Sequence, residues 1–180
     1  SAFGGVFCLN RPVDLAVADK LAAMFVETVF APGYDEDALA KLEEKPNVRL
    51  LENQERRTIP VTEHDIKRVR GGILVQDRDT GMEERELMNV VTERKPSEQE
   101  WGELLFAMRV CKHVRSNAIV LGRGLGTVGV GAGQMSRVDS VRIAIDKARA
   151  AGHSLDGAAL ASDAFFPFAD GPQLAMDAGV

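Results

Sequence analysis

Residues 127–148, TVGVGAGQMSRVDSVRIAIDKA, place three alternating glycines in front of a run with helical spacing. Gly129 and Gly131 lie within TVGVG, an apolar run that predicts a strand. Glycine weakens a strand, and its presence there often means that something approaches the backbone closely. The stretch therefore predicts either a cradle for a phosphate or a tight connection between a strand and a helix.

The helix predicted from Ser136 has a start that suits an anion. Ser136 can cap this helix, with Asp139 three residues later, and Arg137 adds a planar fork of donors. A helix N-terminus itself carries a partial charge of about +0.5. Two interpretations remain open: a capped helix with an exposed arginine, or a pocket for an anion or polar substrate. The inner face of the helix is predicted to be Val138, Val141, Ile145 and Ala148.

The glycines just upstream match a nucleotide-binding pattern in letters only. Gly124, Gly126 and Gly129 fit G-x-G-x-x-G, but the fingerprint needs a helix at the last glycine, and Gly129 lies in a predicted strand. The segment more simply predicts a hairpin between strands at 117–121 and 127–131, with glycines in its turn. A dinucleotide-dependent oxidoreductase stays an alternative that a titration with NADH or NADPH would test.

An aromatic loop, SDAFFPFADG at residues 162–171, stands near the C-terminus. Phe165, Phe166 and Phe168 surround Pro167, which forbids regular structure there. Exposed phenylalanine is costly unless it is covered. The loop therefore either plugs the core or forms a wall on which a flat ring can stack.

Two further groups are candidates for chemistry. Lys112 and His113 could form an acid–base pair, but they fall in the last turn of the helix that contains Trp101, where cations favour the helix dipole. Asn117 stands at the start of the next strand. Its amide could polarise a carbonyl, and it could equally satisfy the backbone of a turn.

Strands and helices alternate along the chain, which predicts a layered α/β fold with a mixed sheet and a single domain over residues 1–180. Residues 53–70 are poorly patterned and are predicted to be a surface excursion, and residues 97–100 form a capping box at a helix start. Strands are predicted at 6–10, 28–34, 47–52, 71–77, 88–93, 117–121, 127–131 and 158–162, and helices after residues 12, 35, 97, 136 and 170.

Composition narrows the class of protein. The chain has 180 residues, 45% hydrophobic, with a net charge of −5 and no block of five or six like charges, which argues against a nucleic-acid-binding surface. No apolar run approaches the roughly 20 residues of a membrane helix. Cys8 and Cys111 are far apart, as are His64, His113 and His153, so the sequence predicts no zinc site. We expect a soluble, cytoplasmic protein.

Five segments together carry a resemblance: SAFGG, APGY, SNAIV, GAGQMSRVDSVRIA, and SDAFFPF with an aspartate two residues on. They resemble the AICAR transformylase region of the bifunctional AICAR transformylase/IMP cyclohydrolase family, over essentially the whole chain. The resemblance implies a cytidine-deaminase-like fold without zinc. It implies transfer of a formyl group from the cosubstrate 10-formyltetrahydrofolate to AICAR in purine (IMP) biosynthesis, by a homodimer whose active sites form at the interface.

The resemblance also implies roles for single residues. Asn117 matches the asparagine that orients or polarises the formyl group, so it is the predicted catalytic residue. Arg137, Phe165 and Asp170 match residues that bind the substrate AICAR. The start of the 136–150 helix and the aromatic loop should therefore face one cleft.

Folate and cation contacts follow from the same resemblance. Phe165, Pro167 and Phe168 match residues at the folate, and Asp163 matches a ligand of the family's monovalent cation, K⁺. Val114 stands where some members carry a hydroxyl residue, and this departure counts against the cation.

Other departures concern what the chain does not contain. The family's catalytic Lys-His pair lies upstream of SAFGG, so the resemblance does not transfer catalysis to Lys112 and His113. The family's C-terminal segment and its cyclohydrolase domain have no counterpart here. We expect an internal piece of the transformylase domain that is inactive alone; the alternative is a non-catalytic α/β scaffold or dimerisation module.

Overall fold

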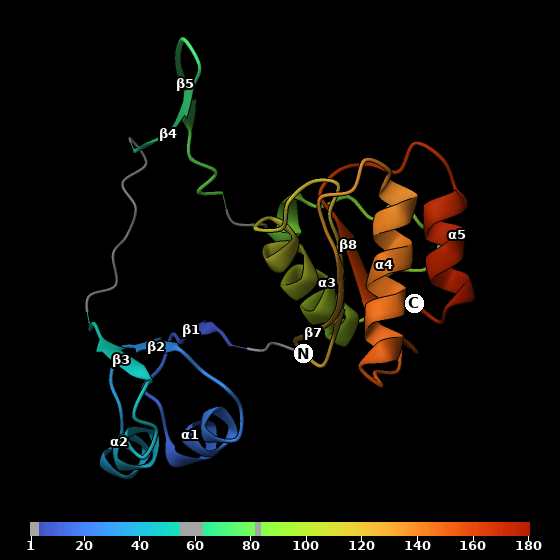
Figure 1. The fold of residues 1–180 in the computed structure, drawn as a ribbon. Coiled ribbons are helices and arrows are strands. Elements are labelled where there is room, and N and C mark those ends of the chain that lie inside the picture. The colour runs from blue at the N-terminus through green and yellow to red at the C-terminus, as the bar shows by residue number, and fades with distance from the viewer. Residues whose placement is uncertain (1–3, 55–62, 82–83) are drawn as a thin grey trace. The chain divides into compact units, whose positions relative to one another are not determined.

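The structure is a computed structural model that describes residues 4–54, 63–81 and 84–180. The chain divides into two compact units, Ser1–Thr80 and Gly81–Val180. Figure 1 shows the elements of both units as ribbons. The single domain expected over residues 1–180 stays a prediction.

The first unit begins with two successive strand–helix–strand crossovers. Strands β1 (Val6–Cys8), β2 (Thr28–Ala31) and β3 (Arg49–Glu52) pair in parallel in that order, because helices α1 (Leu15–Ala22) and α2 (Glu36–Glu43) connect them. Asp14, rather than Pro12, marks the start of α1, since its carboxylate accepts the Val17 N–H at 2.8 Å. The buried core between the sheet and the helices comprises Val13, Ala18, Leu21, Val26, Val29, Ala31, Ala38 and Leu42.

A two-stranded antiparallel hairpin follows, formed by β4 (His64–Val69) and β5 (Gly72–Asp77). Gly71 takes a φ of 85° in the turn, a conformation that glycine reaches without steric cost. The predicted surface excursion is confirmed as exposed over residues 64–69, although the segment forms a strand there, while residues 55–62 lie outside the described ranges. All side chains of β4 are exposed, so the strand has no buried face that would produce an apolar alternation.

The second unit has three layers (Figure 1). Strands β6 (Ile119–Arg123), β7 (Gly126–Gly131) and β8 (Ala159–Ser162) form an antiparallel sheet in the order β7-β6-β8. Helix α3 (Glu98–Cys111) covers one face, and α4 (Arg137–Ala150) and α5 (Asp170–Asp177) cover the other. A short 3-10 helix, η1 (Arg85–Leu87), precedes α3.

The central strand β6 separates two cores. Ile119 and Leu121 are fully buried in the core that α4 and α5 close, whereas Ala118 and Val120 lie in the core under α3. The alternation follows from the period of two in a strand. Because β6 is buried on both faces, residues 118–121, AIVL, form a continuous apolar run.

The predicted α/β class is confirmed, but the single mixed sheet is wrong. Among the described residues the strands form three separate sheets, one wholly parallel and two wholly antiparallel. The parallel strands are joined by helical crossovers, and a tight turn joins β6 to β7, so each connection fixes the sense of its own sheet. Residues 88–93, predicted as a strand, have no regular structure.

Candidate functional site

The glycines of β7 accommodate helix α4. A Cβ atom at Gly131 would lie 1.9 Å from the carbonyl oxygen of Ser140, and one at Gly129 would lie 2.1 Å from that of Ala144. The close approach predicted from these glycines is therefore made by the backbone of α4, and not by a phosphate. Because the glycines have no side chain, the backbone of α4 packs directly on β7, and this contact sets the position of the helix start.

The upstream glycines form a hairpin turn, as the sequence predicted. Gly124 and Leu125 have φ values of 61° and 54°, the positive pair that a two-residue type I′ turn requires. The carboxylate of Glu103 accepts the N–H groups of both residues, at 2.8 and 3.0 Å. No strand-to-helix turn exists at these glycines, so G-x-G-x-x-G has no support here. Glu103 was not predicted; its signal is a carboxylate beside the apolar stripe of α3.

A cavity of about 390 Å³ lies between the start of α4 and the aromatic loop. It brings together most residues predicted for the site, and the expected juxtaposition of the α4 start with the aromatic loop is present. Asp163 stands behind Arg137 and is not part of the lining. The predicted site residues that line the cavity are Asn117, Arg137, Phe165, Pro167, Phe168 and Asp170.

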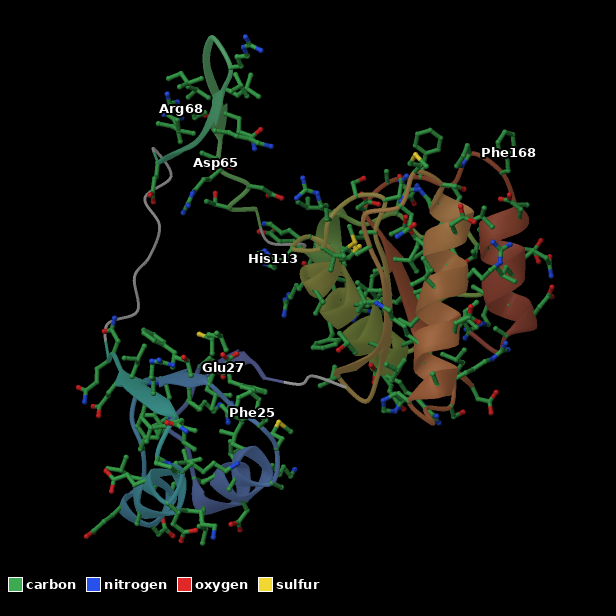
Figure 2. All side chains as sticks on the ribbon, viewed as in Figure 1. Phe25, Glu27, Asp65, Arg68, His113 and Phe168 are labelled. Atoms are coloured by element: carbon green, nitrogen blue, oxygen red, sulfur yellow. The ribbon has the colours of Figure 1, made fainter. Side chains whose placement is uncertain are left out.

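The aromatic loop divides its phenylalanines between the two predicted roles. Phe166 packs against the core under α4 and α5, and its ring lies so close to Gly171 that a Cβ there would be 2.8 Å away. Phe165 and Phe168 are 81% and 74% exposed and line the cavity. Figure 2 shows Phe168 on the loop that leads into α5. Phe166 also lines the cavity, so it belongs both to the core and to the wall, whereas Phe165 and Phe168 belong to the wall.

Helix α4 begins without a side-chain cap. Ser136 occupies the N-cap position, but its side chain makes no capping hydrogen bond, so this part of the prediction is wrong. Asp139 instead pairs with Arg142 at 2.9 Å. Because no side chain caps the first turn, the partial positive charge of the helix end remains available beside the cavity, which Ser136 and Arg137 both line.

Arg137, the first residue of α4, is held by three neighbours. Its Nη1 donates to the Ser162 hydroxyl at 2.8 Å and to Oδ1 of Asp163, and its Nη2 donates to Oδ1 of Asn117 at 2.9 Å. The side chains of Arg137 and Asp163 are only 11% and 18% exposed. The interpretation of an exposed arginine is therefore wrong, and the cavity borders a nearly buried, paired guanidinium.

The side chain of Asn117 is fully engaged. Its Nδ2 donates to the carbonyl oxygens of Gln134 and Met135 at 2.8 and 3.1 Å, while its Oδ1 accepts from Arg137. Its own carbonyl oxygen accepts the hydroxyl of Ser140, a fully buried residue of α4, at 2.7 Å. Asn117 thus satisfies turn backbone, one of its two predicted roles, and at the same time orients Arg137.

Asp163 is a carboxylate whose ionised form is strongly favoured. Burial acts to raise the pKa of Asp163, but hydrogen bonds from Ser116, Arg137 and the Ala118 N–H outweigh it and lower the pKa to about 2. The Ala118 N–H lies 3.0 Å from Oδ1. Asp163 therefore connects the end of β8, the start of β6 and the start of α4 through one negative charge.

The Lys112–His113 pair lies elsewhere. Lys112 is the C-cap of α3, where its Nζ donates to the carbonyl oxygen of Gly81, and His113 follows directly. Neither residue lines the cavity. Figure 2 shows His113 by α3, away from the loop that carries Phe168. Their place at the helix end agrees with the dipole interpretation.

With the geometry in place, comparison with known proteins defines the class. The family model described as the AICARFT/IMPCHase bienzyme matches residues 1–147, and the chain belongs to this family. Similar proteins are the bifunctional purine biosynthesis proteins PurH of Magnetococcus marinus (52% identical, 99% of this chain), Chlorobium phaeobacteroides (50%, 99%) and Enterococcus faecalis (48%, 100%). The chain spans about 35%, 34% and 35% of these relatives, respectively.

Within residues 4–54, 63–81 and 84–180, no helix has the length and apolarity needed to cross a bilayer. The same ranges hold no group of three or more His, Cys, Asp or Glu side chains placed to bind a metal ion.

Proposed function

We propose that this chain is part of a folate-dependent formyltransferase, which transfers the formyl group of 10-formyltetrahydrofolate to the 5-amino group of AICAR in IMP biosynthesis. The full-length protein, on this proposal, is a cytoplasmic homodimer that also carries IMP cyclohydrolase activity. Membership in the AICARFT/IMPCHase family supports it. The observation that carries it is a single cavity bordered by a guanidinium and by two exposed aromatic rings.

The reaction needs groups of these kinds. The AICAR amine attacks the formyl carbon, and the bond from that carbon to folate N10 breaks after a tetrahedral intermediate. Phe165 and Phe168 offer flat apolar surfaces for the heterocycles of substrate and cosubstrate. Arg137 supplies fixed positive charge, because its other contacts hold the guanidinium plane.

Asn117 is the proposed catalytic residue, as a donor to the oxyanion of that intermediate. To act in this way, its Nδ2 must exchange one of its present acceptors for the substrate. The carbonyl oxygen of Met135 is the weaker acceptor, at 3.1 Å, and Met135 is fully exposed. Giving up such a bond costs about 1 kcal/mol, which a charge-assisted bond to an oxyanion offsets.

The general base comes from outside this set of residues. Among the described residues that line the cavity, the titratable side chains are Arg137 and Asp170, and neither a lysine nor a histidine is present. Asp170 Oδ1 accepts the Gly171 N–H at 2.7 Å at the start of α5. We therefore propose that the chain alone is inactive and that the base is completed by other residues of the longer protein, at a dimer interface.

The missing base also favours the second candidate function, a non-catalytic α/β scaffold or dimerisation module. A formyl-transfer assay on the 180-residue chain tests both proposals. Activity above background would contradict the proposal that the chain alone is inactive and the proposal that it is a non-catalytic scaffold. The cytidine-deaminase-like fold implied by the resemblance remains part of the first proposal. It is supported by the α/β layering of the second unit.

The oxygen atoms around Asp163 are poorly suited to bind a monovalent cation. K⁺ would need several oxygen ligands, but Oδ1 of Asp163 is already used by Arg137 and by the Ala118 N–H. A permanent guanidinium charge at the same carboxylate also opposes a second cation.

The test of the proposed function is Asn117→Ala in the full-length protein. We expect turnover to fall by about 10²–10³-fold, the usual loss for an oxyanion donor. Asn47→Ala, at an exposed asparagine of the first unit, is the control and should keep normal turnover. Near-normal turnover of Asn117→Ala would defeat the assignment.

A further inference from the structure

The contact between Arg137 and Asp163 joins two nearly buried charges behind the cavity. Arg137 is the first residue of α4, and Asp163 is the first residue after β8. Asp163 Oδ1 accepts from both Arg137 and the Ala118 N–H. Through this carboxylate, Arg137 is therefore attached to the backbone at the start of β6.

The donors of Arg137 are divided between protein and cavity. Nη1 uses its hydrogens on Ser162 and Asp163, and Nη2 uses one on Asn117. Among the described residues this leaves Nε–H and the other hydrogen of Nη2 for a ligand. Since the guanidinium is planar, fixing the Nη1 edge fixes the direction of the remaining donors.

Charge explains why an anion is required at Asp163. A neutral acceptor could take the same hydrogen bonds, but it would leave the desolvated guanidinium uncompensated. Ser162 and Asn117 are neutral, so Asp163 supplies the negative charge among these three partners of Arg137. Without the charge of Asp163, the solvation free energy of the guanidinium would favour a conformation that turns Arg137 toward water.

We propose that Asp163 is a positioning residue, which acts as the counter-ion of Arg137 and aims it into the cavity, in place of a role as ligand of a monovalent cation. This inference rests on the proposed function only for the identity of the substrate, AICAR. Val114, an apolar residue packed in the core under α3, agrees with the absence of a cation role.

The variant Asp163→Asn separates charge from shape. It keeps the size of the side chain and an oxygen that can accept the Ala118 N–H, and removes the negative charge. In the full-length protein we expect affinity for AICAR, measured by calorimetry, to fall at least about tenfold. Asp163→Glu, which restores the charge, should recover part of the loss.

A matched control lies on the same helix. Asp139→Asn removes the charged partner of Arg142, an exposed arginine. Because exposed pairs contribute little, AICAR affinity should stay within about twofold of the original value. An equal loss in Asp139→Asn and Asp163→Asn would overturn the positioning role, since it would reflect net charge alone.

The role through Arg137 is tested in an Arg137→Gln background. There, Asp163→Asn should cause no further loss of affinity, because its effect passes through the arginine. A merely structural residue would weaken binding in both backgrounds, which would overturn the proposal. So would an AICAR affinity that depends on K⁺ over choline at equal ionic strength and loses that dependence in Asp163→Asn.

Failure of the proposed function is distinguishable from failure of this inference. If the unmodified protein binds no AICAR, the proposed function fails, and the pairing is then measured by urea unfolding of Asp163→Asn, Arg137→Gln and the double variant. Losses of stability that add would overturn the pairing. A double variant less destabilised than the sum supports it.

Discussion

Two helices of the second unit begin with the same kind of sequence and yet begin differently. Helix α3 starts at Ser97-x-x-Glu100 and forms a full capping box: the Ser97 hydroxyl accepts the Glu100 N–H at 3.3 Å, and Glu100 accepts the Ser97 N–H at 2.7 Å. Helix α4 starts at Ser136-x-x-Asp139 and forms neither bond as a cap.

Chain length and location explain the difference. Aspartate is one methylene shorter than glutamate, and Asp139 is engaged with Arg142 on the exposed side of α4. The Glu100 carboxylate reaches back to its N-cap and also binds Arg94. The capped start of α3 therefore stabilises the fold, whereas the uncapped start of α4 presents free N–H groups and Arg137 to a cavity.

The largest effect is expected from moving α4 off the sheet with Gly131→Ala. The new Cβ would lie 1.9 Å from the Ser140 carbonyl, so the helix and its first residue must shift. We expect unfolding free energy to fall by more than about 4 kcal/mol, measured by urea denaturation. The control, Gly133→Ala, has open space and a φ of 67°, and should cost about 1–2 kcal/mol. Equal losses would break the account of how α4 is placed.

A smaller effect compares the two caps directly. Ser97→Ala removes a capping bond and should lower the unfolding free energy by about 1 kcal/mol. Ser136→Ala removes none and should change it by less than about 0.5 kcal/mol. Thermal unfolding of both variants measures the difference, and a Ser136→Ala loss as large as that of Ser97→Ala would mean that α4 is capped after all.

An effect of acid is expected from Asp163. The pKa of Asp163 is lowered from 3.8 to about 2 in the folded chain, so its contribution is fully present above pH 3.8 and disappears as the pH falls through about 2. Unfolding followed between pH 5 and 2 should therefore show a loss of stability that is smaller in Asp163→Asn. Identical pH profiles of the two proteins would contradict the ion pair.

The glycines and phenylalanines show what the sequence can and cannot predict. Glycine in a strand predicts a close approach, but nothing local in Gly129 or Gly131 tells whether a ligand or a helix approaches. The aromatic loop predicts either burial or a wall, and spacing alone does not show that Phe166 packs on the core while Phe165 stays exposed. Both choices depend on where α4 and α5 pack.

Long-range polar contacts and the exposed strand β4 could not be predicted from the sequence either. Glu103 closes a hairpin turn across more than twenty residues of sequence, and Asp163 meets Arg137 across a similar distance, so no local pattern reports either contact. Strand β4 has every side chain exposed and lacks the apolar alternation that marks a strand. Elements with a buried stripe or a complete capping box, such as α3, were predicted well.

The central claim is that Arg137 and Phe165 face one cavity in which AICAR binds. A crystal structure of the full-length protein with AICAR and a folate analogue tests it most directly. The account predicts AICAR within hydrogen-bonding distance of the free edge of the Arg137 guanidinium, with the ring of Phe165 against a ligand heterocycle. A ligand bound elsewhere, with Arg137 and Phe165 on opposite sides of the second unit, would contradict it.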